Sequence, residues 1–174
     1  MKANDKSPNR SSEEIEIVRL VNKFFPESKG YVSKETGLDF GNFILAMKLG
    51  NFNCDYSCEV YGIPPGPDLG LERKGGFDGD YETIYLRLLE HANFHPEGRC
   101  IIVPDVLGFN YGSHTLEKPF ICDQKMVGVR LEELDNFFDE SCDILIVFES
   151  GEALAIDHDH RFFWSKSKIN NAKR

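Results

Sequence analysis

Two histidine-containing segments have residue types that could bind a metal ion. His91 and His95 are four residues apart in a segment with helical periodicity, which would place both imidazoles on one helix face. The tetrapeptide Asp157–His160 combines two carboxylates with two imidazoles, so it could hold a divalent cation or supply a His–Asp general-base pair. The competing interpretations are a helix C-terminus that favours protonated histidine for the first segment and an exposed hairpin turn for the second.

Other candidate nucleophiles and ligand-binding loops lack the partners that their chemistry requires. Cys54 and Cys58 do not form a CxxC motif and have no matching second pair, and Ser113-His114 lies outside any Gly-x-Ser-x-Gly motif. The Gly/Pro-rich segment 62–79 contains neither GxGxxG nor GxxxxGK[ST]. No cofactor is therefore predicted, and segment 62–79 is expected to be a long loop that is mobile or binds a partner.

The acidic residues are concentrated in one part of the chain. The whole chain has 29 acidic and 20 basic residues and a net charge of −9. Ten acids and no Lys or Arg lie between Leu131 and His160, and five bases and no acid follow from Arg161 to Arg174. Such a segment either steers a basic partner by its negative potential or simply forms a solvated face. The residues predicted to bind a partner are Glu132, Glu133, Asp135, Asp139, Glu140, Asp157, His158 and Asp159.

Composition limits the classes of protein to consider. The chain of 174 residues is 41% hydrophobic and 12% aromatic, which is enough for a folded core. It has no apolar run near the roughly 18 to 20 residues that span a bilayer, and its polar N-terminus does not resemble a secretory signal. A sequence pI of about 5.0 argues against binding to nucleic acid or an anionic membrane. The odd number of cysteines favours a reducing, cytoplasmic location, and the apolar neighbours of Cys100 and Cys122 are typical of buried, unreactive thiols.

Hydrophobic periodicity predicts the elements that would position these residues. Helices are predicted over residues 12–25, 80–94 and 131–138, while 38–49 is compatible with a helix or a buried strand. Strands are predicted over 52–61, 100–103, part of 119–129, 143–148, 153–156 and 161–165. The last three strands are separated by short turn sequences, so they are expected to form an antiparallel meander. The predicted class is α+β, with about three helices packed on one face of an antiparallel sheet.

These predictions describe a single globular domain over residues 11–166, with a flexible tail at 1–10 and a basic tail at 167–174. The functional hypothesis is an acidic protein-binding module that docks onto a basic protein. A specific version is a bacterial immunity- or antitoxin-like protein that covers the cationic active site of a nuclease toxin. One alternative is a metal-dependent hydrolase that uses Asp157–His160, and another is a subunit of a larger complex. The oligomeric state is left open.

Overall fold

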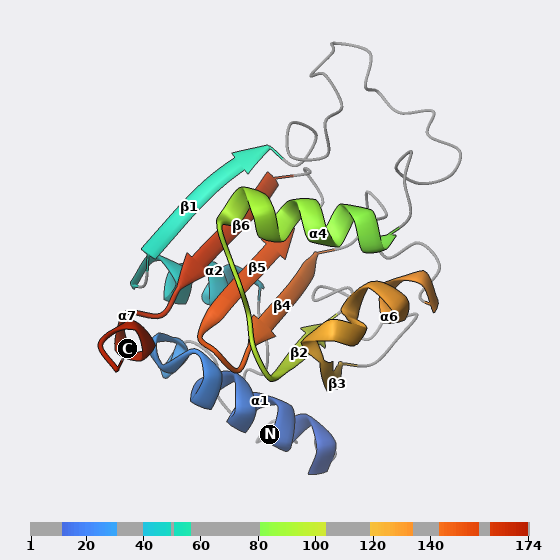
Figure 1. Ribbon diagram of the computed structural model, residues 1–174. Coiled ribbons are helices and arrows are strands. Elements are labelled where there is room, and N and C mark those ends of the chain that lie inside the picture. The colour runs from blue at the N-terminus through green and yellow to red at the C-terminus, as the bar shows by residue number, and fades with distance from the viewer. Residues whose placement is uncertain are drawn as a thin grey trace, which may run out of the picture.

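A six-stranded antiparallel sheet forms the centre of the protein, in the strand order β1-β6-β5-β4-β2-β3 (Figure 1). The computed structural model describes residues 12–30, 40–49, 51–56, 81–103, 119–133, 143–156 and 161–173. The strands are β1 (Asn51–Tyr56), β2 (Arg99–Val103), β3 (Phe120–Asp123), β4 (Ile144–Phe148), β5 (Glu152–Ile156) and β6 (Arg161–Lys166). Every pair of neighbouring strands is antiparallel, with β4, β5 and β6 hydrogen-bonded in chain order.

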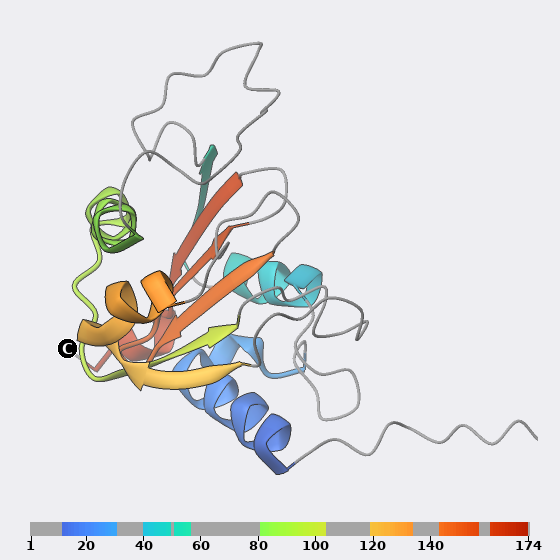
Figure 2. The same cartoon turned by 90° about the vertical axis from the view of Figure 1, so that its right-hand side faces the viewer.

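Helices cover both faces of this sheet. They are α1 (Ser12–Phe24), α2 (Phe40–Leu49), α4 (Tyr81–Ala92), α6 (Val127–Glu133) and α7 (Lys168–Asn171), with 3-10 turns at Pro26–Ser28 and Gln124–Met126. Figure 2 shows α1 and α2 on one side of the sheet and α4 and α6 on the other. The α+β class is therefore confirmed, but the prediction that the helices pack on one face is wrong.

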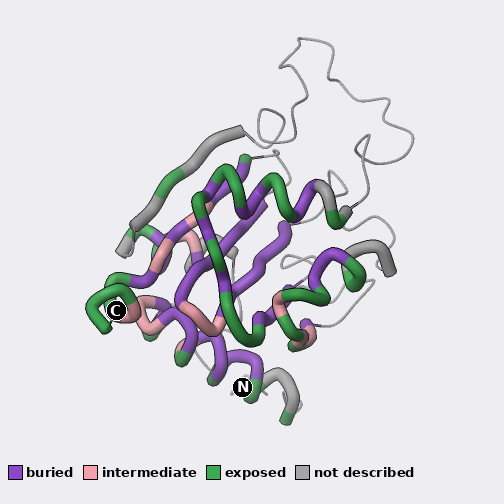
Figure 3. Tube along the Cα trace, in the orientation of Figure 1, coloured by how far each residue is buried: buried purple, intermediate pink, exposed green. Residues whose placement is uncertain are grey.

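The burial of the central strands explains the two layers of helices. Every residue of β4 and β5 is buried, so both faces of these strands need apolar cover (Figure 3). On one face, Ile146 of β4 belongs to a core that includes Leu88 of α4. On the other face, the next residue, Val147, belongs to a core that includes Val21 of α1 and Phe43 of α2. Alternate residues of each strand thus enter different cores.

Two local predictions need correction in their boundaries. The predicted strand within 119–129 ends at Asp123, whose side chain accepts a hydrogen bond of 2.9 Å from the Lys125 amide and so caps a 3-10 turn. The helix predicted over 131–138 begins earlier, at Val127, because Val127 is buried against α4 rather than paired in a strand. Residues 134–138 lie outside the described part of the chain. The ambiguous segment 38–49 is helical from Phe40.

Much of the segment predicted as a basic tail folds onto the body. Ser167 caps α7, and its hydroxyl donates a hydrogen bond of 2.8 Å to the Glu27 carboxylate. The same carboxylate accepts a bond of 2.7 Å from the Lys168 amide, and the Asn170 side chain donates to the Phe24 carbonyl at 3.0 Å. These bonds join the C-terminal helix to the end of α1. None of the helices in the described ranges is long and apolar enough to cross a membrane.

Candidate functional site: an acidic end of the sheet

Three of the ten acids between Leu131 and His160 have internal structural roles. The side chains of Asp143 and Glu152 are buried, with residue exposures of 2% and 0%. Glu149 is held by Arg99 at the start of β2. The expectation that the whole segment forms one solvated face is therefore wrong for Asp143 and Glu152, whereas Glu149 lies at the surface in an ion pair. Their positions explain this, because all three lie next to or within strands whose neighbours are buried.

Glu152 forms an ion pair with Lys166 inside the protein. The two residues are register partners across β5 and β6, so their side chains lie on the same face of the sheet. Lys166 Nζ lies 3.0 Å from Glu152 Oε1, and the ammonium also lies 5.7 Å from the centre of the Phe94 ring. The Lys166 side chain is 29% exposed, so it contacts both the solvent and the buried carboxylate. A carboxylate neutralised in this way is not available to a partner.

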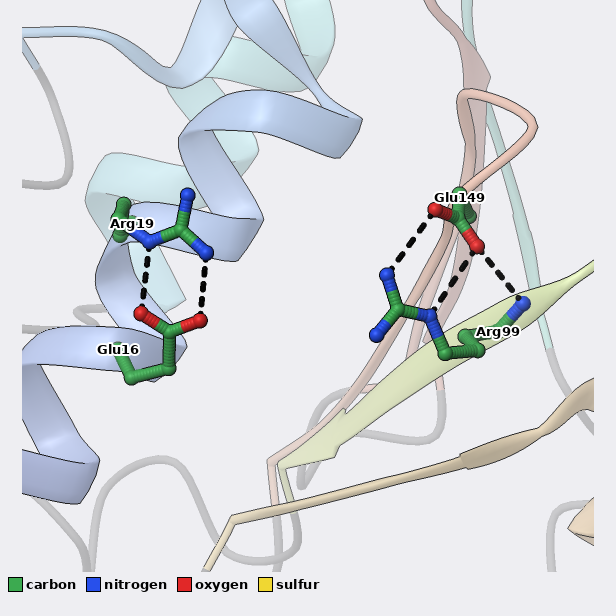
Figure 4. A network of polar contacts seen from close by, with 4 residues as sticks. All are labelled: Glu16, Arg19, Arg99 and Glu149. Carbon is green, nitrogen blue, oxygen red and sulfur yellow. Dashed lines mark hydrogen bonds and ion pairs between the residues drawn. The ribbon is translucent and has the colours of Figure 1, made fainter.

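Glu149 belongs to a group of surface ion pairs that also includes Glu16 and Arg19 of α1 (Figure 4). Arg99 donates to the two Glu149 oxygens from its backbone amide and its guanidinium, at 3.2 to 3.3 Å. These hydrogen bonds hold the pKa of Glu149 below its usual value. Arg19 makes the equivalent bidentate contact with Glu16 and lowers the pKa of that carboxyl. Both pairs are locally compensated and do not contribute a free charge.

The residues predicted to bind a partner lie at or beyond the limits of the described chain. Glu132 and Glu133 are the last two residues of α6, and their side chains are outside the description. Asp135, Asp139, Glu140, Asp157, His158 and Asp159 fall outside the described residues altogether. Their positions in the fold are constrained only by the strands to which their segments are attached.

Strand register places these attachment points at one end of the sheet. Ile144 begins β4 and is the register partner of Ile156, which ends β5, so segments 134–142 and 157–160 join the sheet at the same end. The end of β1 pairs with the start of β6, so the segment that follows β1 is attached at this end as well. The end of β2 pairs with the start of β4 and with the start of β3, so the segment that joins β2 to β3 is also attached there. The four connections at this end, which we call the acidic end, are 57–80, 104–118, 134–142 and 157–160.

The acidic end accounts for the whole net charge of the protein. Its four connections contain twelve Asp or Glu residues and three Lys or Arg residues, a net charge of −9. The rest of the chain contains 17 acids and 17 bases and is neutral. The Gly/Pro-rich segment 62–79, expected from sequence to be a functional loop, lies within one of these connections. Its structure falls outside the described residues.

The candidate metal site at His91 and His95 does not have the expected helical geometry. Helix α4 ends at Ala92, and Asn93 follows with a positive φ of 53°, so His95 is not on the helix. The His91 ring lies 5.0 Å from the Trp164 ring in an edge-on contact and 6.0 Å from Phe162. His91 is thus packed against aromatic rings of β6.

The other predicted ligands and nucleophiles are not assembled by the described structure. The Cys54 side chain, Cys58, Ser113-His114 and Asp157–His160 all lie outside the description. Within the described ranges, no group of three or more His, Cys, Asp or Glu side chains is arranged to hold a metal ion.

One pair of neighbouring thiols was missed by sequence reasoning. Cys100 of β2 and Cys122 of β3 are register partners, and their sulfur atoms lie 3.6 Å apart. They are separated by 22 positions in the chain, so only the pairing of the two strands could have indicated their proximity. Strand register across a long connection is not encoded in any local motif.

The chain matches no protein-family model, no curated protein and no solved structure.

Proposed function

We propose that this protein is an acidic protein-binding module that docks onto a basic protein through the acidic end of its sheet. The observation that carries the proposal is the attachment of four connections, with a combined charge of −9, to the same end of an otherwise neutral fold. Binding residues are commonly placed on loops that a rigid scaffold holds together. A sheet whose central strands are buried on both faces is such a scaffold.

The distribution of charge supports fast and oriented association. A neutral body with a negative pole attracts a basic protein mainly at that pole, and electrostatic steering of this kind raises association rates by tenfold or more. Because the body contains equal numbers of acids and bases, it adds little long-range repulsion or attraction of its own. The binding energy itself then depends on contacts made after the encounter.

The proposed partner is a protein with a cationic groove, and a nuclease toxin fits this description best. An enzyme that binds nucleic acid presents Lys and Arg side chains to phosphate groups. Carboxylates from several connections can occupy these positions and exclude the substrate, as an immunity- or antitoxin-like inhibitor would. The proposal includes a cytoplasmic location, which the odd number of cysteines favours.

The test compares two charge reversals of equal size. The first variant carries Asp157→Lys and Asp159→Lys at the acidic end. The matched control carries Glu90→Lys and Glu97→Lys, two exposed residues of the body. Both variants change the net charge by the same amount. A basic partner is first isolated by pull-down at low salt, and its association rate is then measured by surface plasmon resonance.

We expect the first variant to associate about tenfold more slowly at low ionic strength and the control to change by less than about twofold. At 0.15 M salt the Debye length is about 8 Å, so charges distant from the interface are screened. The same partner, if it is a nuclease, should lose its activity when the wild-type protein is added. An equal reduction in both variants, or an association rate that salt does not change, would contradict the proposal.

A further inference from the structure

Strands β2 and β3 hold two thiols at a separation that a disulfide can bridge. The Gln124 amide donates to the Gly98 carbonyl at 3.0 Å, so these two opposite residues are a hydrogen-bonded pair. In an antiparallel ladder every second pair is of this type, and Cys100 and Cys122 are therefore also a hydrogen-bonded pair. The Cα atoms of such a pair lie about 5.5 Å apart, which is within the usual range for disulfides. The sulfur atoms are 3.6 Å apart, so bond formation needs an approach of about 1.5 Å. Because β3 is at the edge of the sheet, only one neighbouring strand opposes this movement.

The two thiols differ in their access to solvent and in their ionisation. Cys100 is fully buried, whereas Cys122 is only partly buried. The contact with Cys100 lowers the pKa of Cys122, and the positive charge of Arg130 on α6 lowers it further. The contact with Cys122, together with burial, raises the pKa of Cys100. Cys122 is therefore the thiol that ionises first and that a reagent reaches first.

A buried hydroxyl group in the same hydrophobic core as the two cysteines provides a further observation. Tyr85 of α4 is 3% exposed, and its Oη has no hydrogen-bond partner within the described residues. Burial raises the pKa of Tyr85, and the nearby Cys100 and Cys122 raise it further. The phenol consequently stays protonated and remains an unused donor. An unpaired buried donor is unfavourable, because its lost hydrogen bonds to water are not replaced.

We propose that Cys100 and Cys122 form an oxidisable dithiol that reacts with hydrogen peroxide and closes to a cross-strand disulfide. The Cys122 thiolate attacks one peroxide oxygen, the O–O bond breaks, and the other oxygen leaves as hydroxide, which takes up a proton to form water. The Cys100 sulfur then attacks the Cys122 sulfenic acid, the S–O bond breaks, and a second water leaves as the S–S bond forms. Two thiols lose two electrons in total, and the peroxide gains them.

The test uses the full-length protein and hydrogen peroxide as the probe. Reduced protein is treated with one equivalent of peroxide, and non-reducing peptide mapping identifies the linked cysteines. We expect a loss of about 2 Da in intact mass, a Cys100–Cys122 crosslink and full reversal by dithiothreitol. In the Cys100→Ser variant, the Cys122 sulfenic acid should instead persist and be trapped by dimedone. Cys142→Ser is the matched control and should form the crosslink at the wild-type rate.

A second measurement does not depend on the folding of any variant. In the reduced wild-type protein, iodoacetamide should alkylate Cys122 at least about tenfold faster than Cys100, because Cys122 is the more exposed and more readily ionised thiol. The proposal is wrong if both cysteines resist alkylation and peroxide in the folded protein. It is also wrong if peroxide links Cys122 to a cysteine other than Cys100.

Discussion

The buried ion pair between Glu152 and Lys166 gives the sharpest test of how this sheet is stabilised. Glu152 is completely buried, and its closest cation is Lys166 Nζ at 3.0 Å. Apart from this ion pair, neither carboxylate oxygen has a hydrogen-bond partner in the described part of the chain. The substitution Lys166→Met keeps most of the side-chain volume but removes the charge. It therefore leaves a buried carboxylate with no compensating cation.

The expected cost follows from this geometry. Removing one partner of a buried ion pair typically destabilises a protein by about 3 to 5 kcal/mol. Lys166 is 29% exposed, so water can reach part of the vacated space, and we expect a value near the lower limit, about 3 kcal/mol. The double substitution Glu152→Leu with Lys166→Met replaces both charges by apolar groups. It should have a stability within about 1 kcal/mol of the wild type, or above it.

Urea unfolding of the wild type, the two single variants and the double variant provides the measurement. The double-mutant cycle should give a coupling free energy of about 2 to 3 kcal/mol between positions 152 and 166. If the free energy of unfolding falls with urea concentration at the same slope in all four proteins, the same cooperative unit unfolds in each. The reasoning would be refuted if Lys166→Met lowered the free energy of unfolding by less than about 1 kcal/mol. It would also be refuted if the double variant were as unstable as Lys166→Met alone.

Three further predictions concern single sites. Gly151 has a φ of +96°, and a Cβ there would overlap the Asn170 side chain, so Gly151→Ala should cost about 2 to 3 kcal/mol in thermal unfolding. Tyr85→Phe removes a buried hydroxyl without a partner and should raise the free energy of unfolding by about 1 kcal/mol; a loss of stability would show that the hydroxyl is satisfied. The lowered pKa of Glu149 means that its contact with Arg99 stabilises the fold above the ordinary glutamate pKa of 4.5 and that this contribution is lost at lower pH. Glu149→Gln should therefore show a smaller loss of stability than the wild type in acid titrations followed by circular dichroism.

The sequence predicts most of the elements because their signals are local. The helical spacing of Ile15, Val18, Val21 and Phe25 and the uninterrupted apolar run of β4 identify a helix and a strand without knowledge of the fold. The apolar run of β4 also indicates how many faces of the sheet are covered by helices. Five consecutive apolar residues indicate a strand that is covered on both faces, whereas a sheet with helices on one face would alternate apolar and polar residues. The prediction of one helical layer overlooked this distinction.

The candidate site was less accessible to sequence reasoning because it depends on strand pairing. Glu152 was counted as a surface acid, since nothing in the surrounding sequence shows that Lys166 lies opposite it in the neighbouring strand. Glu149 finds its partner Arg99 at a separation of 50 positions. Cys100 and Cys122 become neighbours only when β2 and β3 pair. In each case the residue types were evident, but the register that gives them their roles is a property of the whole sheet.

The ends of the strands determine which acidic residues enter the sheet and which belong to the connections between strands. Glu152 within β5 and Asp143 before β4 are buried with the strands. The acids beyond the strand ends remain in the connections, and antiparallel pairing gathers four such connections at one end. The ten acids between Leu131 and His160 are thereby divided between the strands and the connections, and acids from distant parts of the chain belong to connections attached at the same end. The attachment of these acidic connections to one end of the sheet is thus a consequence of its topology, and the net charge alone would not have indicated it.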